Sequence, residues 1–442
     1  MIPTLVAALV QPFRLGHDGG VSTERAGAAG HGLGVRLITV AVCTGLAAGV
    51  AGVLLTLLLH LVQHLAFGYT EATFLTGVER ASPLRRVLAL GVGGLVVGLG
   101  WWALRRWTAP LSSIDDAVRD GTGRLPLREA TAEGVLQIVA VGCGASLGRE
   151  GAPRLLGAAL AGWLADRTGL GSTQRRTVLA CGAGAGLASV YNVPLGGALF
   201  TLEILLMSAA LREVIPALIS SAVATAVAWP VLSSRPTYLV APVSLHPNEI
   251  VFAAALGPIA GLLAVGFVRL AAAARRAAPT GWRLPIVVTV VFAGLGAVAI
   301  AYPALLGNGK GPAQLALDGS TSLLLLATLI LLKPIATAAC LASGANGGLL
   351  TPALAIGALL GALAGGGFSM LWPGTPVAAF AMIGAAAVLA AAQRAPLCAI
   401  VLVLEFTQTG LTLLLPLGIA VGGAMLVAER LRAAPLSGVK PG

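Results

Sequence analysis

The fold is decided by the stretch GLASVYNVPLGGALFTLE, residues 186–203, because its pattern recurs as VLAAAQRAPLCAIVLVLE at residues 388–405. The two copies share a Leu-Ala pair near the start, a Pro-Leu pair in the middle and a Leu-Glu pair at the end. Upstream, GREGAP at 148–153 corresponds to GGLLTP at 347–352, and each segment precedes a run of small apolar residues. Two matched landmarks at an offset of about 200 residues indicate an internal repeat.

The composition of the chain indicates a membrane protein. Hydrophobic residues make up 57% and charged residues 10% of its 442 residues, and the mean hydropathy is +0.92, whereas a soluble domain carries about 25% charged residues. Apolar runs such as 37–59 and 250–268 have the length of a membrane helix and do not alternate. Aromatic residues amount to only 5%, which disfavours a β-barrel with aromatic girdles. We therefore expect an all-α polytopic membrane protein.

The repeat divides the chain into two membrane halves, residues 35–235 and 248–432, between an N-terminal segment 1–34 and a short tail 433–442. Each half holds about seven apolar segments, several of them shorter than a full bilayer crossing. An odd number of crossings turns the second half upside down, so we expect two inverted-topology repeats of tilted and broken helices. In such folds the substrate binds at the interface of the repeats, near helix N-termini that face it.

The net charge of +11 is concentrated at the chain ends and in one central loop. Arginines precede the first apolar run, occur within residues 275–283, and follow residue 429. By the positive-inside rule these regions are cytoplasmic, which places both termini inside the cell and residues 235–247 and 303–320 outside. We expect a multi-pass protein of the inner (plasma) membrane whose basic regions serve topology and do not bind nucleic acid.

Glu150 is the first candidate for the chemistry of the site. It lies in the segment 148–151, which follows a run of small residues and opens an apolar helix. A helix that begins inside the membrane presents unpaired N–H groups and the positive end of its dipole, which attract an anion or the Glu150 carboxylate itself. A carboxylate that occupies an anion's seat and leaves when protonated is a gate. The alternative is a glutamate that only complements the helix dipole, with Arg149 as its ion-pair partner.

The second half contains an equivalent helix start. Gly347 and Gly348 allow the backbone to approach an ion closely, and Pro352 falls in the first helical turn, where no N–H is needed. The backbone N–H groups of Leu349 and Leu350 are therefore candidate donors to an anion. A start built from glycine and proline is common in helices that bind nothing.

Ser112 is a candidate ion ligand in the segment LSSIDD, residues 111–116, between apolar runs of the first half. Its hydroxyl can contact an ion. The same pattern of serine followed by two aspartates is equally typical of an ordinary capped helix start.

These segments resemble the CLC family of chloride channels and proton/chloride exchangers. That family builds its anion path from three motifs, G-S-G-I-P, G-R/K-E-G-P and G-x-F-x-P, together with a segment N-x-P-L-x-G. Residues 148–151 match the second motif apart from its proline, and residues 192–197 match the N-x-P-L-x-G segment. Residues 343–352 match the third motif with Leu350 in place of phenylalanine. The first motif is degraded, because residues 111–115 keep only its serine and isoleucine.

The resemblance implies roles for individual residues. Glu150 would be the external gating glutamate that competes with chloride, and Ser112 would coordinate the central anion, since serine at this place goes with chloride and proline with nitrate. The implied anion-binding set is Ser112, Gly148, Arg149, Gly151, Gly348, Leu349 and Leu350. The family is a homodimer with one pathway in each subunit.

Two departures from the family pattern bear on the mechanism. Proton/chloride exchangers usually carry a second glutamate directly after the position of Glu203, and here that position is Ile204, which cannot relay a proton. The family's central tyrosine belongs to the last helix, whereas this chain has no tyrosine after Tyr302. Both losses argue against tight proton coupling.

Four further charged residues lie inside apolar stretches: Glu203, Glu405, Lys333 and Arg394. Charges in lipid are costly and often functional. Because Glu203 and Glu405 are equivalent in the repeat, we expect each to brace its own half by accepting backbone hydrogen bonds. For Lys333 and Arg394 the sequence names no partner.

The favoured function is transmembrane chloride transport, passive or loosely proton-coupled. A proton/chloride antiporter that reaches Glu150 through water is the alternative, with protons as a second partner. A fluoride-selective transporter is less favoured. An enzyme is not expected, since no nucleophile with a base is visible. The five cysteines and five histidines form no metal-binding pattern, so we expect no metal or cofactor.

Overall fold

The computed structural model describes residues 23–68, 73–109, 113–120, 125–374 and 376–433. Within these ranges the regular structure is helical, apart from one antiparallel bridge between Gly148 and Gly348. The first half comprises α2 (Thr23–Phe67), α3 (Phe74–Arg80), α4 (Pro83–Trp107), α5 (Ile114–Asp120), α6 (Leu127–Gly142), α7 (Gly151–Thr168), α8 (Ser172–Tyr191), α9 (Pro194–Leu199), the π-helical turn η1 (Phe200–Leu206) and α10 (Leu211–Leu232).

The second half has a similar order of elements, without a helix equivalent to α3 between its first two long helices. It comprises α11 (Pro247–Arg276), α12 (Arg283–Ala301), the 3-10 turn η2 (Pro303–Leu305), α13 (Lys310–Asp318), α14 (Leu323–Ala342), α15 (Leu350–Leu371), α16 (Val377–Gln393), α17 (Pro396–Thr407) and α18 (Leu414–Ala433). In the described residues, eight helices are long and apolar enough to cross a membrane: α2 from Gly34, α4, α10, α11, α12, α14, α15 and α18. Helix α2 begins at Thr23, within the segment expected to precede the membrane region.

The duplicated sequence stretches fold in the same way in both halves. Helices α8 and α16 end at Asn192 and Arg394, whose φ angles of 57° and 58° are left-handed. Two residues later, Pro194 and Pro396 begin α9 and α17. Proline at the first helical turn loses no hydrogen bond, because the N–H it lacks has no partner there in any case. The repeated Pro-Leu pair therefore marks a break between two helices in each half.

Helices α7 and α8 pack closely, as do their counterparts α15 and α16. A Cβ atom at Gly157 would collide with the carbonyl oxygen of Gly182, and one at Gly357 would collide with that of Gly384. Small residues let membrane helices approach each other, and close contact gains dispersion energy that lipid cannot supply. The small-residue runs after both upstream landmarks thus form close helix–helix interfaces in the core.

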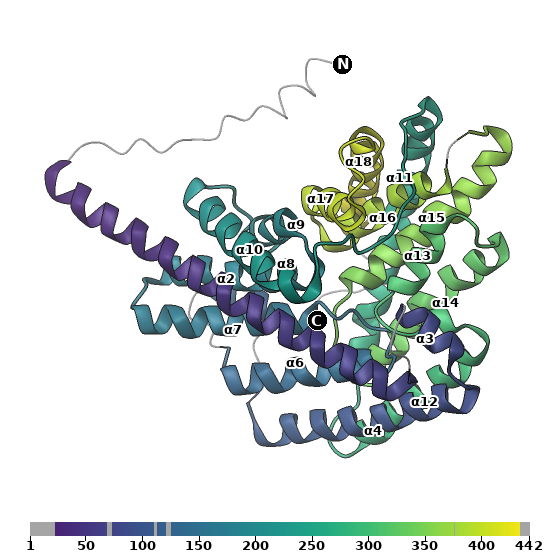
Figure 1. The fold of residues 1–442 in the computed structure, drawn as a ribbon, viewed down its shortest axis with the longest axis horizontal. Coiled ribbons are helices and arrows are strands. Elements are labelled where there is room, and N and C mark those ends of the chain that lie inside the picture. Colours follow the sequence, from purple (N-terminus) through teal and green to yellow (C-terminus); the bar gives the residue numbers. More distant parts are fainter. Residues whose placement is uncertain (1–22, 69–72, 110–112, 121–124, 375, 434–442) are drawn as a thin grey trace, which may run out of the picture.

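The long helices cover these pairs from outside. In Figure 1 the purple α2 runs along α7, α8 and α10, and α11 lies beside the yellow α18. The pairs α2–α10 and α11–α18 also meet through glycines. A Cβ at Gly45 of α2 would lie 2.6 Å from the carbonyl oxygen of Ser220, and one at Gly257 of α11 would lie 2.7 Å from that of Ala420. The repeated packing confirms the predicted all-α polytopic fold.

Candidate anion site

The two halves meet at the two matched helix starts. The N–H of Gly148 donates to the carbonyl oxygen of Gly348 at 2.8 Å, and the N–H of Gly348 donates back to that of Gly148 at 2.9 Å. This antiparallel exchange brings the N-terminus of α7 against that of α15. Residues about 200 positions apart in the sequence therefore share one site.

Glu150 is fully buried at this junction, with 0% of its surface exposed. Its Oε1 accepts hydrogen bonds from the N–H of Leu350 at 2.7 Å and of Thr351 at 3.3 Å. Its Oε2 accepts from the Thr351 hydroxyl at 2.6 Å and from the Tyr191 hydroxyl at 3.4 Å. Four donors thus surround one carboxylate at the positive end of α15.

The expectation that Glu150 sits on the helix it opens is wrong. Glu150 is the N-cap residue of α7, yet its backbone is already helical and its side chain forms no capping hydrogen bond with α7. The carboxylate crosses to α15 because the Gly148–Gly348 bridge holds the second helix start directly opposite. The donors of α15 that bind this carboxylate, Leu350 and Thr351, therefore belong to the second half of the repeat. We call the position of the bound carboxylate the Glu150 seat.

Glycine is required beside this carboxylate. A Cβ added to Gly148 or to Gly348 would collide with the carboxylate of Glu150, and a Cβ added to Gly151 would collide with Oε1 of Gln137. These three positions belong to the predicted anion-binding set. Gly148 and Gly348 leave room for the carboxylate by having no side chain, and Gly151 leaves room for Gln137.

The remaining members of that set are placed differently. Leu349 is the N-cap of α15 and stands directly before the donor Leu350. Ser112 lies outside the described residues. The neighbouring Ser113 accepts from the N–H of Asp116 at 3.0 Å and donates to its carboxylate at 2.6 Å, so this part of the segment is an ordinary capped helix start.

Arg149 is not the ion-pair partner of Glu150. Its guanidinium donates to the carbonyl oxygen of Val190 at 3.2 Å and lies 4.8 Å from the ring centroid of Tyr191. No carboxylate among the described residues lies within ion-pairing distance of it. Arg149 instead contributes positive potential close to Lys310 and His60.

Tyr191 and Thr351 are site residues that the motifs did not single out. Besides Glu150, the Tyr191 hydroxyl lies 3.5 Å from the Thr351 hydroxyl and 3.5 Å from the Asn308 amide nitrogen. Its ring packs edge-on against Phe406 at 5.4 Å. Both residues were present in the quoted repeat segments, but no periodicity shows that a hydroxyl from α8 meets one from α15.

Glu203 and Glu405 accept backbone hydrogen bonds, but not from their own halves. Glu203 accepts from the N–H groups of Leu397 at 3.1 Å and Cys398 at 2.6 Å, at the start of α17. Glu405 accepts from those of Leu195 at 3.0 Å and Gly196 at 2.7 Å, at the start of α9. The expectation that each braces its own half is therefore wrong, because the equivalent helices lie antiparallel and each acid reaches the start of the other.

The two cations without predicted partners have unlike environments. Lys333 is fully buried and donates to the Ser146 hydroxyl at 2.8 Å and to the carbonyl oxygens of Leu305 at 3.1 Å and Gly307 at 2.9 Å. These three bonds use all the protons of its ammonium group. Arg394 is mostly exposed and lies 3.4 Å from a carboxylate oxygen of Glu429. Both contacts hold neighbouring segments together.

A buried polar chain leads toward the junction along α6. Glu133 accepts from the indole N–H of Trp101 at 3.0 Å, the Gln137 amide at 3.1 Å and the Asn346 amide at 2.9 Å. Because Gln137 donates through its nitrogen, its oxygen points the other way, toward Gly151, and this buried oxygen has no hydrogen-bond partner. Ile204, at the position of the missing acid, packs against the hydrophobic core.

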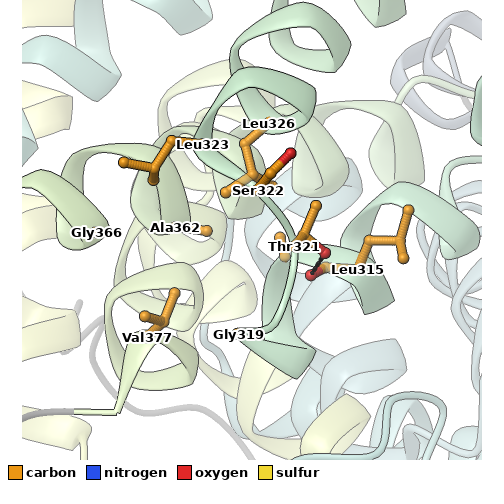
Figure 2. A pocket seen from close by; sticks show the side chains of 10 residues that line it. Leu315, Gly319, Thr321, Ser322, Leu323, Leu326, Ala362, Gly366 and Val377 are labelled. Carbon is orange, nitrogen blue, oxygen red and sulfur yellow. Dashed lines mark hydrogen bonds between the residues drawn. The ribbon is translucent and has the colours of Figure 1, made fainter.

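The cavity in Figure 2 is separate from this junction. It measures about 270 Å³ and is lined by residues of α13 to α16, among them Thr321, whose hydroxyl donates to the carbonyl oxygen of Leu315 at 2.7 Å. No charged side chain and none of the predicted site residues line it. The cavity belongs to the second half alone and does not reach Glu150.

The fold and this site define a membrane transport protein for anions. The chain belongs to the voltage-gated chloride channel family, whose model matches residues 93–429. It is therefore a chloride transport protein of the CLC family and not an enzyme.

Two curated relatives support this membership. The chain is 33% identical over 349 residues to a ClcB-like chloride channel protein of Ralstonia nicotianae, covering 75% of this chain and 80% of that one. It is 30% identical over 362 residues to the voltage-gated ClC-type chloride channel ClcB of Escherichia coli, covering 78% and 85%.

Two solved structures share the fold. A slow cyanobacterial Cl⁻/H⁺ antiporter matches with a TM-score of 0.80 at 22% identity, over 90% of this chain and 96% of that one. A CLC-type fluoride/proton antiporter matches with a TM-score of 0.71 at 21% identity, over 93% and 98%.

Proposed function

We propose that each subunit conducts chloride through a pathway that Glu150 gates, passively or with loose proton coupling. One observation carries the proposal: the Glu150 carboxylate occupies a set of N–H and hydroxyl donors at the start of α15. Such donors, at the positive end of a helix, suit chloride as well as a carboxylate. The two anions therefore compete for one seat.

Protonation controls this competition. A protonated Glu150 loses its charge, and with it the attraction of the α15 dipole, which is worth roughly 0.3–2 kcal/mol. The side chain then leaves the seat and chloride enters. The Leu350 amide and the open space left by Gly148, Gly151 and Gly348 form the seat in this proposal. Leu349 and Ser112 contribute donors to the central anion in this proposal. Arg149 attracts anions toward the pathway.

Loose coupling follows from Ile204, whose hydrocarbon side chain cannot pass protons to Glu150. A second candidate function, proton/chloride exchange, is supported by the chain from Asn346 through Glu133 to Gln137. Glu133 is a buried acid, and the free oxygen of Gln137 faces Gly151, the residue after Glu150. A water molecule on that oxygen would allow a proton to pass from Glu133 to Glu150.

The predicted topology gives this chain of polar residues a cytoplasmic end. Arg105 donates to the carbonyl oxygen of Gly344 at 2.7 Å and Arg275 to that of Gly347 at 3.3 Å, so the loop that holds Asn346 lies on the arginine-rich side. The positive-inside rule makes this side cytoplasmic. Asn308, at the Tyr191 hydroxyl, belongs to the loop predicted to lie outside. Glu133 would then accept protons from inside the cell.

The test is chloride efflux from liposomes that contain the purified protein, with the external pH recorded at the same time. Sustained chloride efflux that depends on Glu150 supports the gated pathway. Proton movement against its gradient at a fixed ratio to chloride supports exchange. A protein that moves neither ion would contradict both candidates, and faster movement of fluoride than of chloride would favour the fluoride alternative. The assembly expected from the family is a homodimer, which cross-linking in the same liposomes measures.

A further inference from the structure

Arg154 is a cation in the membrane core that forms no ion pair with the described residues. It lies in the first turn of α7, four residues after Glu150. Its guanidinium stacks over the ring of Phe200, 4.6 Å from the centroid. No carboxylate of the described residues lies within ion-pairing distance, and its buried Nε has no hydrogen-bond partner.

The surroundings of Arg154 place it inside the protein and beside the junction. Its charge acts on Glu150 and Tyr191, which are 0% and 3% exposed, and on Asp115 at the start of α5. Phe200, beneath the guanidinium, is 1% exposed. Arg154 itself is partly exposed, and it lies close enough to both Glu150 and Asp115 to interact with their charges.

An unpaired guanidinium at this place needs a reason, because two effects oppose it. A charged group in the membrane interior is costly unless it meets an opposite charge or water. A cation in the first turn of a helix is also repelled by the positive end of the dipole. The charge of the guanidinium and the positive end of the helix dipole together make the space next to Arg154 positive. Such a potential is favourable for an anion and for no other small ion.

Glu150 does not fill this role. Its carboxylate already accepts hydrogen bonds from Leu350, Thr351 and Tyr191. No ion pair joins it to Arg154 in the seated position. The guanidinium therefore acts on the seat through space and keeps its donors for a different group.

We propose that Arg154 binds the transported anion directly, at a position between α5 and the Glu150 seat. This inference rests on the proposed chloride pathway and adds a residue to it. The guanidinium takes the place of donors that this chain lacks, namely the tyrosine missing from its last helix and the glycines missing from residues 111–115. Its flat fork of N–H groups binds oxyanions such as nitrate through two bonds and chloride through one. Arg154 thereby also sets anion preference.

The binding test measures chloride affinity of the purified protein by titration calorimetry. A hydrogen bond to a charged group contributes about 1.5–3 kcal/mol, so Arg154→Gln should weaken chloride binding by about tenfold or more. The loss should persist when Glu150→Gln is also present, because the anion and not the glutamate is the partner. Equal affinity of Glu150→Gln with and without Arg154→Gln would overturn the proposal.

Anion preference gives a second readout, in which the positive charge at residue 154 is kept. Arg154→Lys keeps the charge but loses the fork, so the ratio of nitrate to chloride flux in liposomes should fall while chloride flux persists. An unchanged ratio would contradict direct contact. Arg167→Gln is the matched control, since Arg167 lies at the other end of α7 and stacks over Trp163 at 4.0 Å.

The outcomes separate this inference from the proposed function. If wild-type protein moves chloride and Arg154→Gln leaves both affinity and preference unchanged, only the role of Arg154 is wrong. If wild-type protein in liposomes moves no anion, the pathway itself is wrong and the role of Arg154 falls with it. Elution of each variant as a single species in size-exclusion chromatography shows that it is folded.

Discussion

The hydroxyl of Thr351 donates to Oε2 of Glu150 at 2.6 Å, and this contact joins the two halves of the repeat at their common site. Glu150 comes from the start of α7 and Thr351 from the start of α15, which are equivalent helices of opposite direction. The proposed gating carboxylate of the first half therefore binds donors of the second half.

Replacement of Glu150 by glutamine should remove the pH response of chloride transport. Glu150→Gln keeps the shape of the side chain and removes the charge that competes with chloride. Flux in the variant should persist, become nearly independent of external pH and lose any proton coupling. Wild-type flux should rise as the external pH falls, since protonation releases the carboxylate. Efflux from liposomes over a series of external pH values measures this, and a Gln variant that keeps the wild-type response would show that the gate lies elsewhere.

Loss of the hydroxyl donors should open the gate. Thr351→Val and Tyr191→Phe each remove one hydrogen bond to the seated carboxylate, and a bond to a charged group is worth about 1.5–3 kcal/mol. Chloride flux near neutral pH should increase by about tenfold or more, with a larger effect for Thr351 with its 2.6 Å contact than for Tyr191 at 3.4 Å.

Thr328→Val serves as the control for these two variants. Its hydroxyl donates to the carbonyl oxygen of Leu324 on the exposed side of α14. Thr328 is not among the donors to Glu150. A flux increase in this control equal to that in Thr351→Val would mean that the effect is not specific to the gate.

Anion selectivity should depend on Ser112 if that residue completes the central site. Ser112→Pro removes the hydroxyl and should shift the preference from chloride toward nitrate. Competition between the two anions in the efflux assay measures the shift, with Ser113→Ala as control because Ser113 caps α5 through Asp116. Identical nitrate-to-chloride ratios in wild type and Ser112→Pro would remove Ser112 from the anion path.

Proton movement should be weak and should depend on Glu133. Since Ile204 supplies no acid, chloride efflux should drive little or no uphill proton movement in the wild type. Whatever movement occurs should disappear in Glu133→Gln while chloride flux remains. Glu129→Gln, one turn earlier on α6, is the control. Robust proton flux at a fixed ratio to chloride would favour exchange over loose coupling, and its survival in Glu133→Gln would exclude this route.

Removal of either exchanged glutamate should destabilise the fold to a similar extent. Glu203→Gln and Glu405→Gln each weaken two backbone hydrogen bonds across the halves, and the charged bonds are worth about 1.5–3 kcal/mol apiece. We expect a lower midpoint of thermal unfolding in detergent for both, with anion preference unchanged. A change of nitrate-to-chloride preference without loss of stability would instead assign these acids to transport.

The sequence by itself determined the class of the protein and the place of its site. Hydropathy requires lipid around the chain, and the two matched landmarks require a repeat whose halves meet at broken helices. The pattern 148–151 also singled out Glu150, because a carboxylate next to a helix start inside a membrane has few roles. These conclusions depend on local composition and on self-comparison, both of which a single sequence contains.

Only the tertiary structure decided which groups meet. The sequence assigned Glu150 to its own helix and Glu203 and Glu405 to their own halves, whereas all three reach the opposite half. It gave no sign that Tyr191 and Thr351 both bind the Glu150 carboxylate, or that Arg154 lies near it without an ion pair to any described residue. The physical reason is that an inverted repeat brings equivalent segments together antiparallel, about 200 residues apart in the chain. Helix periodicity carries information over a few turns, and a contact across that distance is fixed only by packing.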